Sequence, residues 1–219
     1  KYTFKKTSVL ILIFVSTFAF SQEGRTEKKI IKSVNKNTEH AIELLKKAVN
    51  INSGTMNFAG VIKVGKLFKA ELDKLGFETK LTSGDAYGRG GHLIAKKEGT
   101  KGPKFLMIGH LDTVFETDSP FQEYTMLNDS IIKGPGVADM KGGDVIIILA
   151  MKALKEAGVL EDMSIEIIMT GDEEKSGEPL SLSKKDLIDA AKRADIALGF
   201  ENGDNRPKTI VVSRRGSAD

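Results

Sequence analysis

The sequence predicts an α/β fold in which a mixed, largely parallel sheet is flanked by helices. Short apolar runs that are typical of strands alternate along the chain with longer segments in which apolar residues recur at helical spacing. Such alternation favours a sheet whose faces are covered by helices. The sequence contains no internal repeat, and its 219 residues are enough for one core of ordinary domain size.

The first two elements are expected to be helices. Apolar residues recur at helical spacing from residue 38 to residue 49, and the segment 53–55 interrupts this pattern. A second helix is expected after Asn57, which is a candidate N-cap, and Gly76 is a candidate C-terminal stop.

Strands and helices then alternate to the end of the chain. The strands are expected at residues 77–81, 92–98, 104–109, 164–169 and 195–200. A helix is expected at residues 142–158, because this segment is long, keeps its lysines on one outer face and ends in glycine. Another helix is expected at residues 184–194, between the last two strands.

The N-terminal segment is typical of a secretory signal. Lys1, Lys5 and Lys6 precede an apolar stretch from Val9 to Phe20, and small residues follow at alternate positions. A membrane anchor is the alternative, but it needs about 20 apolar residues and this stretch is shorter. We therefore expect a signal peptide over residues 1–21, no stable membrane anchor, and a periplasmic or secreted protein.

Charge and composition exclude several partners. The chain has 33 Lys and Arg against 30 Asp and Glu, and removal of the three signal lysines leaves 30 of each. The mature chain is therefore formally neutral and has no basic stripe with interleaved aromatic residues, so nucleic acid is not an expected partner. Because the chain has no cysteine, any metal must be bound by His, Asp and Glu.

Polar side chains follow the expected strands at the edge where α/β proteins place their functional sites. The strand 104–109 runs into His110 and Asp112, whose side chains share a face because they are two residues apart in an extended segment. Such a carboxylate can orient an imidazole whose other nitrogen binds a metal. Taken alone, this short pattern is more often an ordinary polar pair.

The segment 134–144, with the sequence GPGVADMKGGD, has glycines on either side of Asp139. A phosphate-binding loop would require a Lys followed by Ser or Thr, whereas Lys141 is followed by two glycines. We interpret these glycines as allowing the backbone to pack closely around a single inward carboxylate and to start the next helix.

Carboxylates also follow two other expected strands. Asp172, Glu173 and Glu174 come after residues 164–169, and Glu201 follows the last strand. Three adjacent carboxylates repel one another unless water, a proton or a cation relieves the repulsion. Because one histidine and several acids are expected at one sheet edge, the sequence predicts a site for a cation of the zinc, manganese or magnesium type.

Four motifs stand in order along the chain: GHLDTVF, GPGVADMKGG, TGDEEKSGE and GFE. They resemble those of the co-catalytic zinc family that contains glutamate carboxypeptidase, aminoacylase and succinyl-diaminopimelate desuccinylase, and they are most similar to the glutamate-carboxypeptidase branch. The resemblance implies two Zn²⁺ per complete subunit, with Co²⁺ or Mn²⁺ as possible substitutes. It implies that His110 and Glu201 bind one zinc, that Glu174 binds the other, and that Asp139 bridges both.

The resemblance also implies the catalytic roles. Glu173 would be the general base, and Asp112 would be the partner behind His110. The other histidines are expected to be structural or solvated, with His40 on the polar side of the first helix and His92 in a glycine-rich turn.

The family pattern calls for one more histidine as the last ligand of the second zinc, and none follows His110. We therefore expect residues 22–212 to be the N-terminal part of an incomplete catalytic domain. Residues 213–219 would then begin an inserted lid and dimerisation domain, and a homodimer is expected at full length.

The resemblance implies a secreted zinc-dependent exopeptidase of the carboxypeptidase or dipeptidase type. It would hydrolyse an amide bond next to a free carboxylate in a small peptide, through a water that bridges two zinc ions. One alternative is an N-acyl-amino-acid deacylase with the same chemistry. Another is a metal-bound binding protein without catalytic activity.

Overall fold

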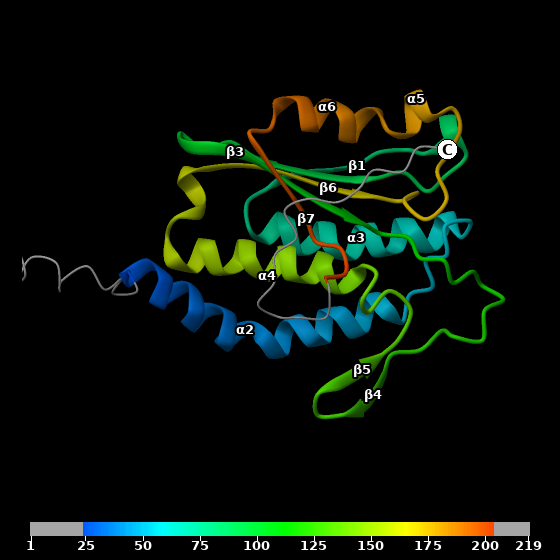
Figure 1. Ribbon diagram of the computed structural model, residues 1–219, viewed down its shortest axis with the longest axis horizontal. Helices are drawn as coiled ribbons and strands as arrows, with labels where there is room; N and C mark the ends of the chain where they lie inside the picture. The colour runs from blue at the N-terminus through cyan, green and yellow to red at the C-terminus, as the bar shows by residue number, and fades with distance from the viewer. Residues whose placement is uncertain (1–23, 204–219) are drawn as a thin grey trace, which may run out of the picture.

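The computed structural model describes residues 24–203, which form a five-stranded sheet between layers of helices (Figure 1). The strand order is β1-β2-β6-β3-β7. The strands are β1 (Glu78–Leu81), β2 (Leu93–Lys97), β3 (Lys101–His110), β6 (Met163–Thr170) and β7 (Ile196–Gly199). The signal peptide expected at residues 1–21 and the segment 213–219 lie outside the described residues.

The strand directions confirm a mixed α/β sheet. Strand β3 is parallel to both β6 and β7, and β2 is antiparallel to both β1 and β6. Four strands therefore run the same way and only β2 opposes them. As a result, the carboxyl ends of β3, β6 and β7 meet at one edge of the sheet.

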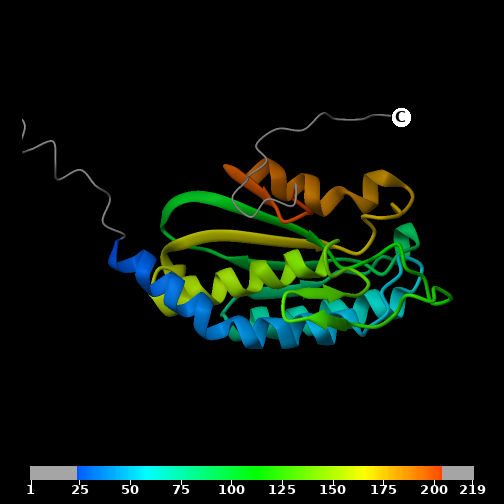
Figure 2. The same cartoon turned by 60° about the horizontal axis from the view of Figure 1, so that its bottom comes forward.

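Helices cover both faces of this sheet. Helix α3 (Phe58–Lys74) and α4 (Lys141–Ala157) lie on one face, while α5 (Leu180–Ser183) and α6 (Lys185–Arg193) lie on the other (Figures 1 and 2). The expected ends of α3 are confirmed. The Gly60 N–H donates to Asn57 Oδ1 at 3.1 Å, and Gly76 has a φ of 86°, which glycine adopts without strain.

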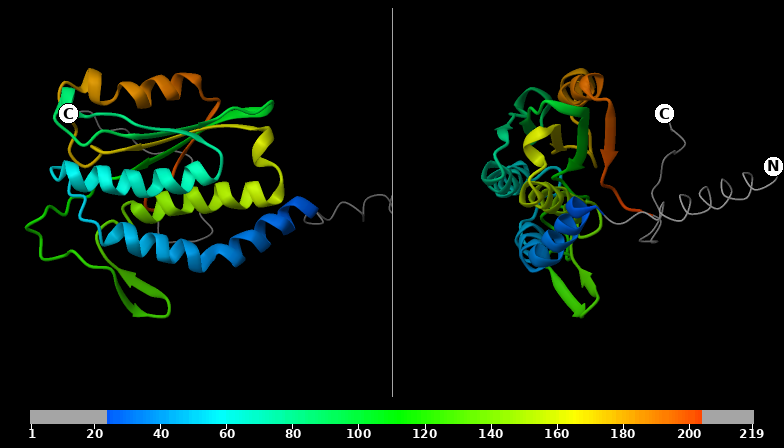
Figure 3. Two further views of the ribbon diagram at one scale, coloured as in Figure 1. Left: turned by 180° about the vertical axis from the view of Figure 1, so that it is seen from behind. Right: turned by 90° about the vertical axis from the view of Figure 1, so that its left-hand side faces the viewer.

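Helix α2 (Arg25–Val49) begins earlier than residue 38, where its apolar pattern begins. It packs outside α4, as the view from behind shows (Figure 3). In its first half, Ser33 and Asn37 are buried against α4, and Ser33 Oγ donates to Glu156 Oε2 at 2.8 Å. This part of the helix is joined to α4 by polar side chains, so apolar periodicity could not reveal it.

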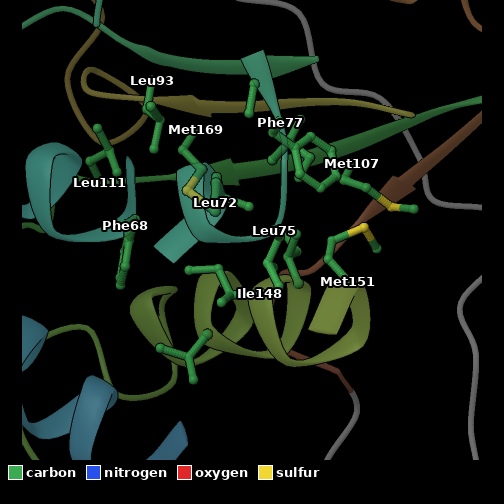
Figure 4. Close-up of a cluster of buried hydrophobic side chains, with 14 of the residues drawn as sticks. Phe68, Leu72, Leu75, Phe77, Leu93, Met107, Leu111, Ile148, Met151 and Met169 are labelled. Atoms are coloured by element: carbon green, nitrogen blue, oxygen red, sulfur yellow. The ribbon is translucent and has the colours of Figure 1, made fainter. Parts of the chain in front are cut away.

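The main core lies between the sheet and helices α3 and α4 (Figure 4). Successive residues of a strand point to opposite faces, so Met107 of β3 packs into this core while its neighbour Leu106 packs toward α6 with Ile168 and Ala190. Phe68 of α3 is fully buried. Burial of each such large apolar side chain contributes about 1.5–3 kcal/mol, which fixes the sheet on its helical layer.

A second, two-stranded sheet was not expected from the sequence. Strands β4 (Thr125–Asn128) and β5 (Ile131–Lys133) form a hairpin that projects from the layers (Figure 1). The hairpin is mostly exposed, so the alternation that marks a half-buried strand is missing from its sequence. Among the described residues, none of the helices is long and apolar enough to cross a membrane.

Candidate metal centre

His110 is the last residue of β3 and its side chain is buried. Its Nδ1 lies 3.0 Å from the backbone oxygen of Asp112 and 3.5 Å from Asp112 Oδ1. Because the carbonyl oxygen can only accept, Nδ1 carries the proton in this contact. The other ring nitrogen, Nε2, then remains for a ligand.

Carboxylates surround Nε2 of His110. It lies 3.0 Å from Asp139 Oδ1, 3.6 Å from Glu201 Oε1 and 4.0 Å from Glu173 Oε2. The ligand atoms of His110, Asp139 and Glu201 lie within 4.8 Å of one another, and so do those of His110, Glu173 and Glu174. The structure thus brings together all four residues predicted to bind metal, and their roles as ligands stay predictions.

The electrostatics of this cluster fit a cation. Burial lowers the pKa of His110, but the hydrogen bond and charge of Asp112, together with Glu201 and Asp144, outweigh this effect and raise the pKa to about 10. The pKa of Glu174 is raised by burial and by the nearby Asp139. A divalent cation would relieve this excess of negative charge, and a set of one imidazole and several carboxylates suits zinc.

Asp112 connects the two halves of the site. Its Oδ2 accepts hydrogen bonds from Thr55 Oγ1 at 2.7 Å and from the Glu174 N–H at 3.2 Å, and its Oδ1 accepts one from the Glu173 N–H at 3.1 Å. Burial raises the pKa of Asp112, but hydrogen bonds from His110 and Thr55 outweigh it and leave the pKa lowered. One buried carboxylate therefore contacts both the His110 ring and the backbone that carries Glu173 and Glu174.

The three adjacent carboxylates after β6 point to different surroundings. Asp172 is fully buried, accepts a hydrogen bond from the Gly177 N–H at 2.9 Å and lies 3.3 Å from Lys184 Nζ. Glu173 and Glu174 instead face His110. Lys184 thus relieves the negative charge of Asp172, whereas Glu173 and Glu174 add their charge to the cluster around His110.

The segment 134–144 differs from the expectation in two respects. Asp139 follows the β4–β5 hairpin rather than a strand of the main sheet, and its side chain is 51% exposed. The fully buried carboxylate is Asp144, in the first turn of α4. Neither of its oxygens has a hydrogen-bond partner among residues 24–203, and burial raises its pKa well above the usual range.

Gly143 of this segment allows close packing, as expected, but the packing is not around Asp139. A Cβ on Gly143 would lie 2.1 Å from the backbone oxygen of Phe200. A Cβ on Gly109, at the end of β3, would lie 2.1 Å from Asp144 Oδ1. The close approach of α4 to the ends of β3 and β7 therefore depends on glycine, which has no side chain, at positions 109 and 143.

The other two histidines lie apart from the metal centre. His92 is buried: its Nδ1 accepts a hydrogen bond from the Gly171 N–H at 3.1 Å, and its Nε2 lies 2.9 Å from the Ser183 backbone oxygen. It therefore has the structural role that was predicted. His40 on α2 is 51% exposed and lies 3.4 Å from Glu71.

Comparison with known proteins identifies the family. Residues 106–213 match the model of peptidase family M20/M25/M40. Carboxypeptidase G2 from Pseudomonas sp. (strain RS-16) is 32% identical over 195 residues, which are 89% of this chain and 46% of that protein. The chain belongs to peptidase family M20/M25/M40. Succinyl-diaminopimelate desuccinylase from Gluconacetobacter diazotrophicus is 33% identical over 186 residues, or 81% of this chain and 47% of that protein.

Solved structures agree with this membership at the level of the fold. The yeast dipeptidase Dug1p from Saccharomyces cerevisiae has a TM-score of 0.62 at 18% identity, over 78% of this chain and 40% of that one. The M20 family metallo-carboxypeptidase Sso-CP2 from Sulfolobus solfataricus has a TM-score of 0.59 at 19% identity, over 74% of this chain and 37% of that one. The chain spans about half the length of the curated relatives it matches.

Two residues at the centre of this M20 family chain were not found from the sequence. Thr55 lies in a segment that was interpreted only as a break between helices, yet its hydroxyl contacts Asp112. Asp144 closes the glycine-rich segment but was not distinguished from Asp139. Asp144 directly follows two glycines in the first turn of the expected helix, and this position was the signal in the sequence that could have identified it.

Proposed function

We propose that the full-length protein is a zinc-dependent exopeptidase of the carboxypeptidase or dipeptidase type. It would hydrolyse an amide bond next to a free carboxylate. The observation that carries this proposal is the grouping of Asp139, Glu201, Glu173 and Glu174 around His110 Nε2. Similarity to carboxypeptidase G2 over 89% of the chain supports this choice of reaction.

Two metal sites are proposed within this group. His110, Asp139 and Glu201 would hold one ion. By the family resemblance, Asp139 and Glu174, which lie close enough for Asp139 to raise the pKa of Glu174, would contribute to the other. Zn²⁺ is the proposed metal, with Co²⁺ or Mn²⁺ as substitutes. When bound, such ions would lower the pKa of the attacking water and polarise the substrate carbonyl.

Glu173 is the residue proposed to move the proton. Its side chain is 52% exposed, so substrate and water can reach its carboxylate, while Asp112 holds its backbone N–H at 3.1 Å. In this position the carboxylate accepts a proton from the attacking water and passes it to the departing amine nitrogen. Asp112 keeps the proton on Nδ1 of His110, so that Nε2 is presented to the site.

The test is hydrolysis by the full-length protein of matched substrates with and without a chelator. Dipeptides with a free C-terminal carboxylate should be cleaved, the same dipeptides as C-terminal amides should not, and chelation should abolish cleavage until zinc is restored. Equal cleavage of acids and amides would contradict the requirement for a free carboxylate.

A second candidate is an N-acyl-amino-acid deacylase. The 33% identity to succinyl-diaminopimelate desuccinylase, over 81% of the chain, favours it. Faster hydrolysis of N-acyl amino acids than of dipeptides in the same assay would select this activity. Tight zinc binding without turnover of either class would instead indicate a metal-bound binding protein.

Export and dimerisation are part of the same proposal. The lysines and the apolar stretch of residues 1–21 support a cleaved signal peptide and a periplasmic or secreted location. N-terminal sequencing of the mature protein should find Gln22 as the first residue. Light scattering of the full-length protein should give the mass of a homodimer, and a monomer would contradict that part of the proposal.

A further inference from the structure

We propose that Thr55 is a positioning residue of the metal centre. Through its hydroxyl it fixes the Asp112 carboxylate, and through Asp112 it fixes both the His110 ring and the backbone of Glu173 and Glu174. The inference rests on the proposed metal-dependent function for its catalytic readout, but its metal-binding readout is independent of any substrate.

The contacts of Asp112 give Thr55 this role. Thr55 is 2% exposed, and its Oγ1 donates to Asp112 Oδ2 at 2.7 Å, which is shorter than the 3.1 and 3.2 Å bonds from the Glu173 and Glu174 N–H groups. Because Asp112 is fully buried, water cannot replace a lost donor. Loss of the hydroxyl would leave the carboxylate with the longer bonds from the Glu173 and Glu174 N–H groups, and these would restrain its orientation beside His110 less tightly.

The backbone around Thr55 holds the hydroxyl in a fixed place. The Thr55 N–H donates to the Thr113 oxygen at 3.1 Å, and the Thr113 N–H donates to the Ser53 oxygen at 2.9 Å. These two bonds form a parallel bridge beside the segment that carries Asp112. The next turn is closed by a bond from the Asn57 N–H to the Gly54 oxygen at 2.7 Å.

The same turn leads directly into α3, because Asn57 is the N-cap of that helix. Thr55 is therefore held between an inter-segment bridge on one side and a capped helix on the other. A donor that is fixed in this way restrains its acceptor, as the supporting residues of a metal site must do.

Ser53 provides a matched control in the same segment. It is also fully buried and also carries a hydroxyl, but its Oγ has no hydrogen-bond partner among residues 24–203. If a buried hydroxyl in this segment mattered only for the fold, Thr55→Val and Ser53→Ala would act alike. If Thr55 positions Asp112, only Thr55→Val will alter the metal centre.

The experiment compares Thr55→Val, Thr55→Ala, Thr55→Ser and Ser53→Ala in the full-length protein. Zinc affinity is measured by chelator competition, the geometry of the centre by the visible absorption of the Co²⁺-substituted protein, and folding by thermal unfolding. Thr55→Val should weaken zinc binding by about 10- to 100-fold and alter the cobalt spectrum, because loss of an outer-shell partner has an effect of this size. Thr55→Ser, which keeps the hydroxyl, should restore both, and Ser53→Ala should match the wild type.

Activity separates this inference from the proposed function. With a cleaved substrate, Thr55→Val should lower kcat more than it changes KM, since the Glu173 backbone loses its support from Asp112. Weakened zinc binding in a protein that cleaves no substrate would leave the positioning role standing and refute the proposed function instead.

Two results would overturn the positioning role. One is unchanged zinc affinity and an unchanged cobalt spectrum in folded Thr55→Val. The other is failure of both Thr55→Val and Thr55→Ala to fold, because the hydroxyl would then be required by the fold and not by the centre.

Discussion

Asp172 should contribute strongly to stability although it lies beside two residues of the metal centre. Its buried carboxylate accepts hydrogen bonds from the Gly177 N–H at 2.9 Å, from Ser183 Oγ and from Lys184 Nζ at 3.3 Å. The substitution Asp172→Asn keeps the size of the side chain but replaces one acceptor oxygen by an amino group that can only donate. At least one of the three donors then loses its acceptor, and Lys184 loses its opposite charge.

The expected loss follows from these contacts. A hydrogen bond to a charged group contributes about 1.5–3 kcal/mol, and breaking a buried ion pair costs about 3–5 kcal/mol. Because the Lys184 side chain is 26% exposed, water partly replaces its partner. We therefore expect Asp172→Asn to lower the free energy of unfolding by about 2–4 kcal/mol. For a chain of this size that corresponds to a decrease in Tm on the order of 10 °C.

The assay is urea or thermal unfolding of the metal-free protein, with Asp162→Asn as the control. Asp162 also pairs with a lysine, Lys101, at 2.9 Å, but the two side chains are 49% and 71% exposed. An exposed pair of this kind contributes about 0–1 kcal/mol. If the Tm of Asp172→Asn lay within about 2 °C of that of Asp162→Asn, the buried hydrogen bonds and ion pair of Asp172 would not stabilise the segment after β6, and the reasoning would be wrong.

Three further predictions test the centre. Glu173→Gln should retain wild-type zinc content but lower kcat by about 100- to 10,000-fold, as measured by metal analysis and steady-state kinetics. Substantial remaining turnover would show that another group takes the proton. Gly109→Ala should lower Tm, because the added Cβ would lie 2.1 Å from Asp144 Oδ1. The control, Gly199→Ala, should change Tm little, because no atom lies within 4 Å of its Cβ. Equal changes in Tm for the two variants would contradict the steric argument. Carboxylates raise the pKa of His110 from 6.5 to about 10 against the lowering effect of burial, so the metal-free protein should lose stability as pH rises toward 10. With saturating zinc, the free energy of unfolding should not show this loss over the same pH range, since a zinc-bound imidazole is neutral. The same pH dependence with and without zinc would refute the assignment of His110 as a zinc ligand.

Much of the fold was predictable because its signals are local. Helix α4 is long, apolar and ended by Gly158, and it forms within one residue of the expected bounds. The cap and stop of α3 are read from Asn57 and Gly76 alone. Periodicity failed where an element is not stabilised by apolar burial, as in the first half of α2 and in the exposed β4–β5 hairpin.

The grouping of the candidate site was also predictable in outline. His110 ends β3, while Glu173 and Glu201 follow β6 and β7, and because these three strands run parallel their ends meet at one edge. Asp139 reaches the same group by another route, from the loop before α4, and its motif rather than a strand end indicated it.

The sequence by itself determined most of the helices, most of the strands and the set of acids that follow them, because each depends on residues close together in the chain. Only the tertiary structure decided how those acids are held. The hydroxyl of Thr55 meets Asp112 across 57 positions, and the same carboxylate binds the backbone of Glu173 across 61. No local pattern encodes such contacts, because they form only when the segment before α3, the end of β3 and the turn after β6 are packed against one another.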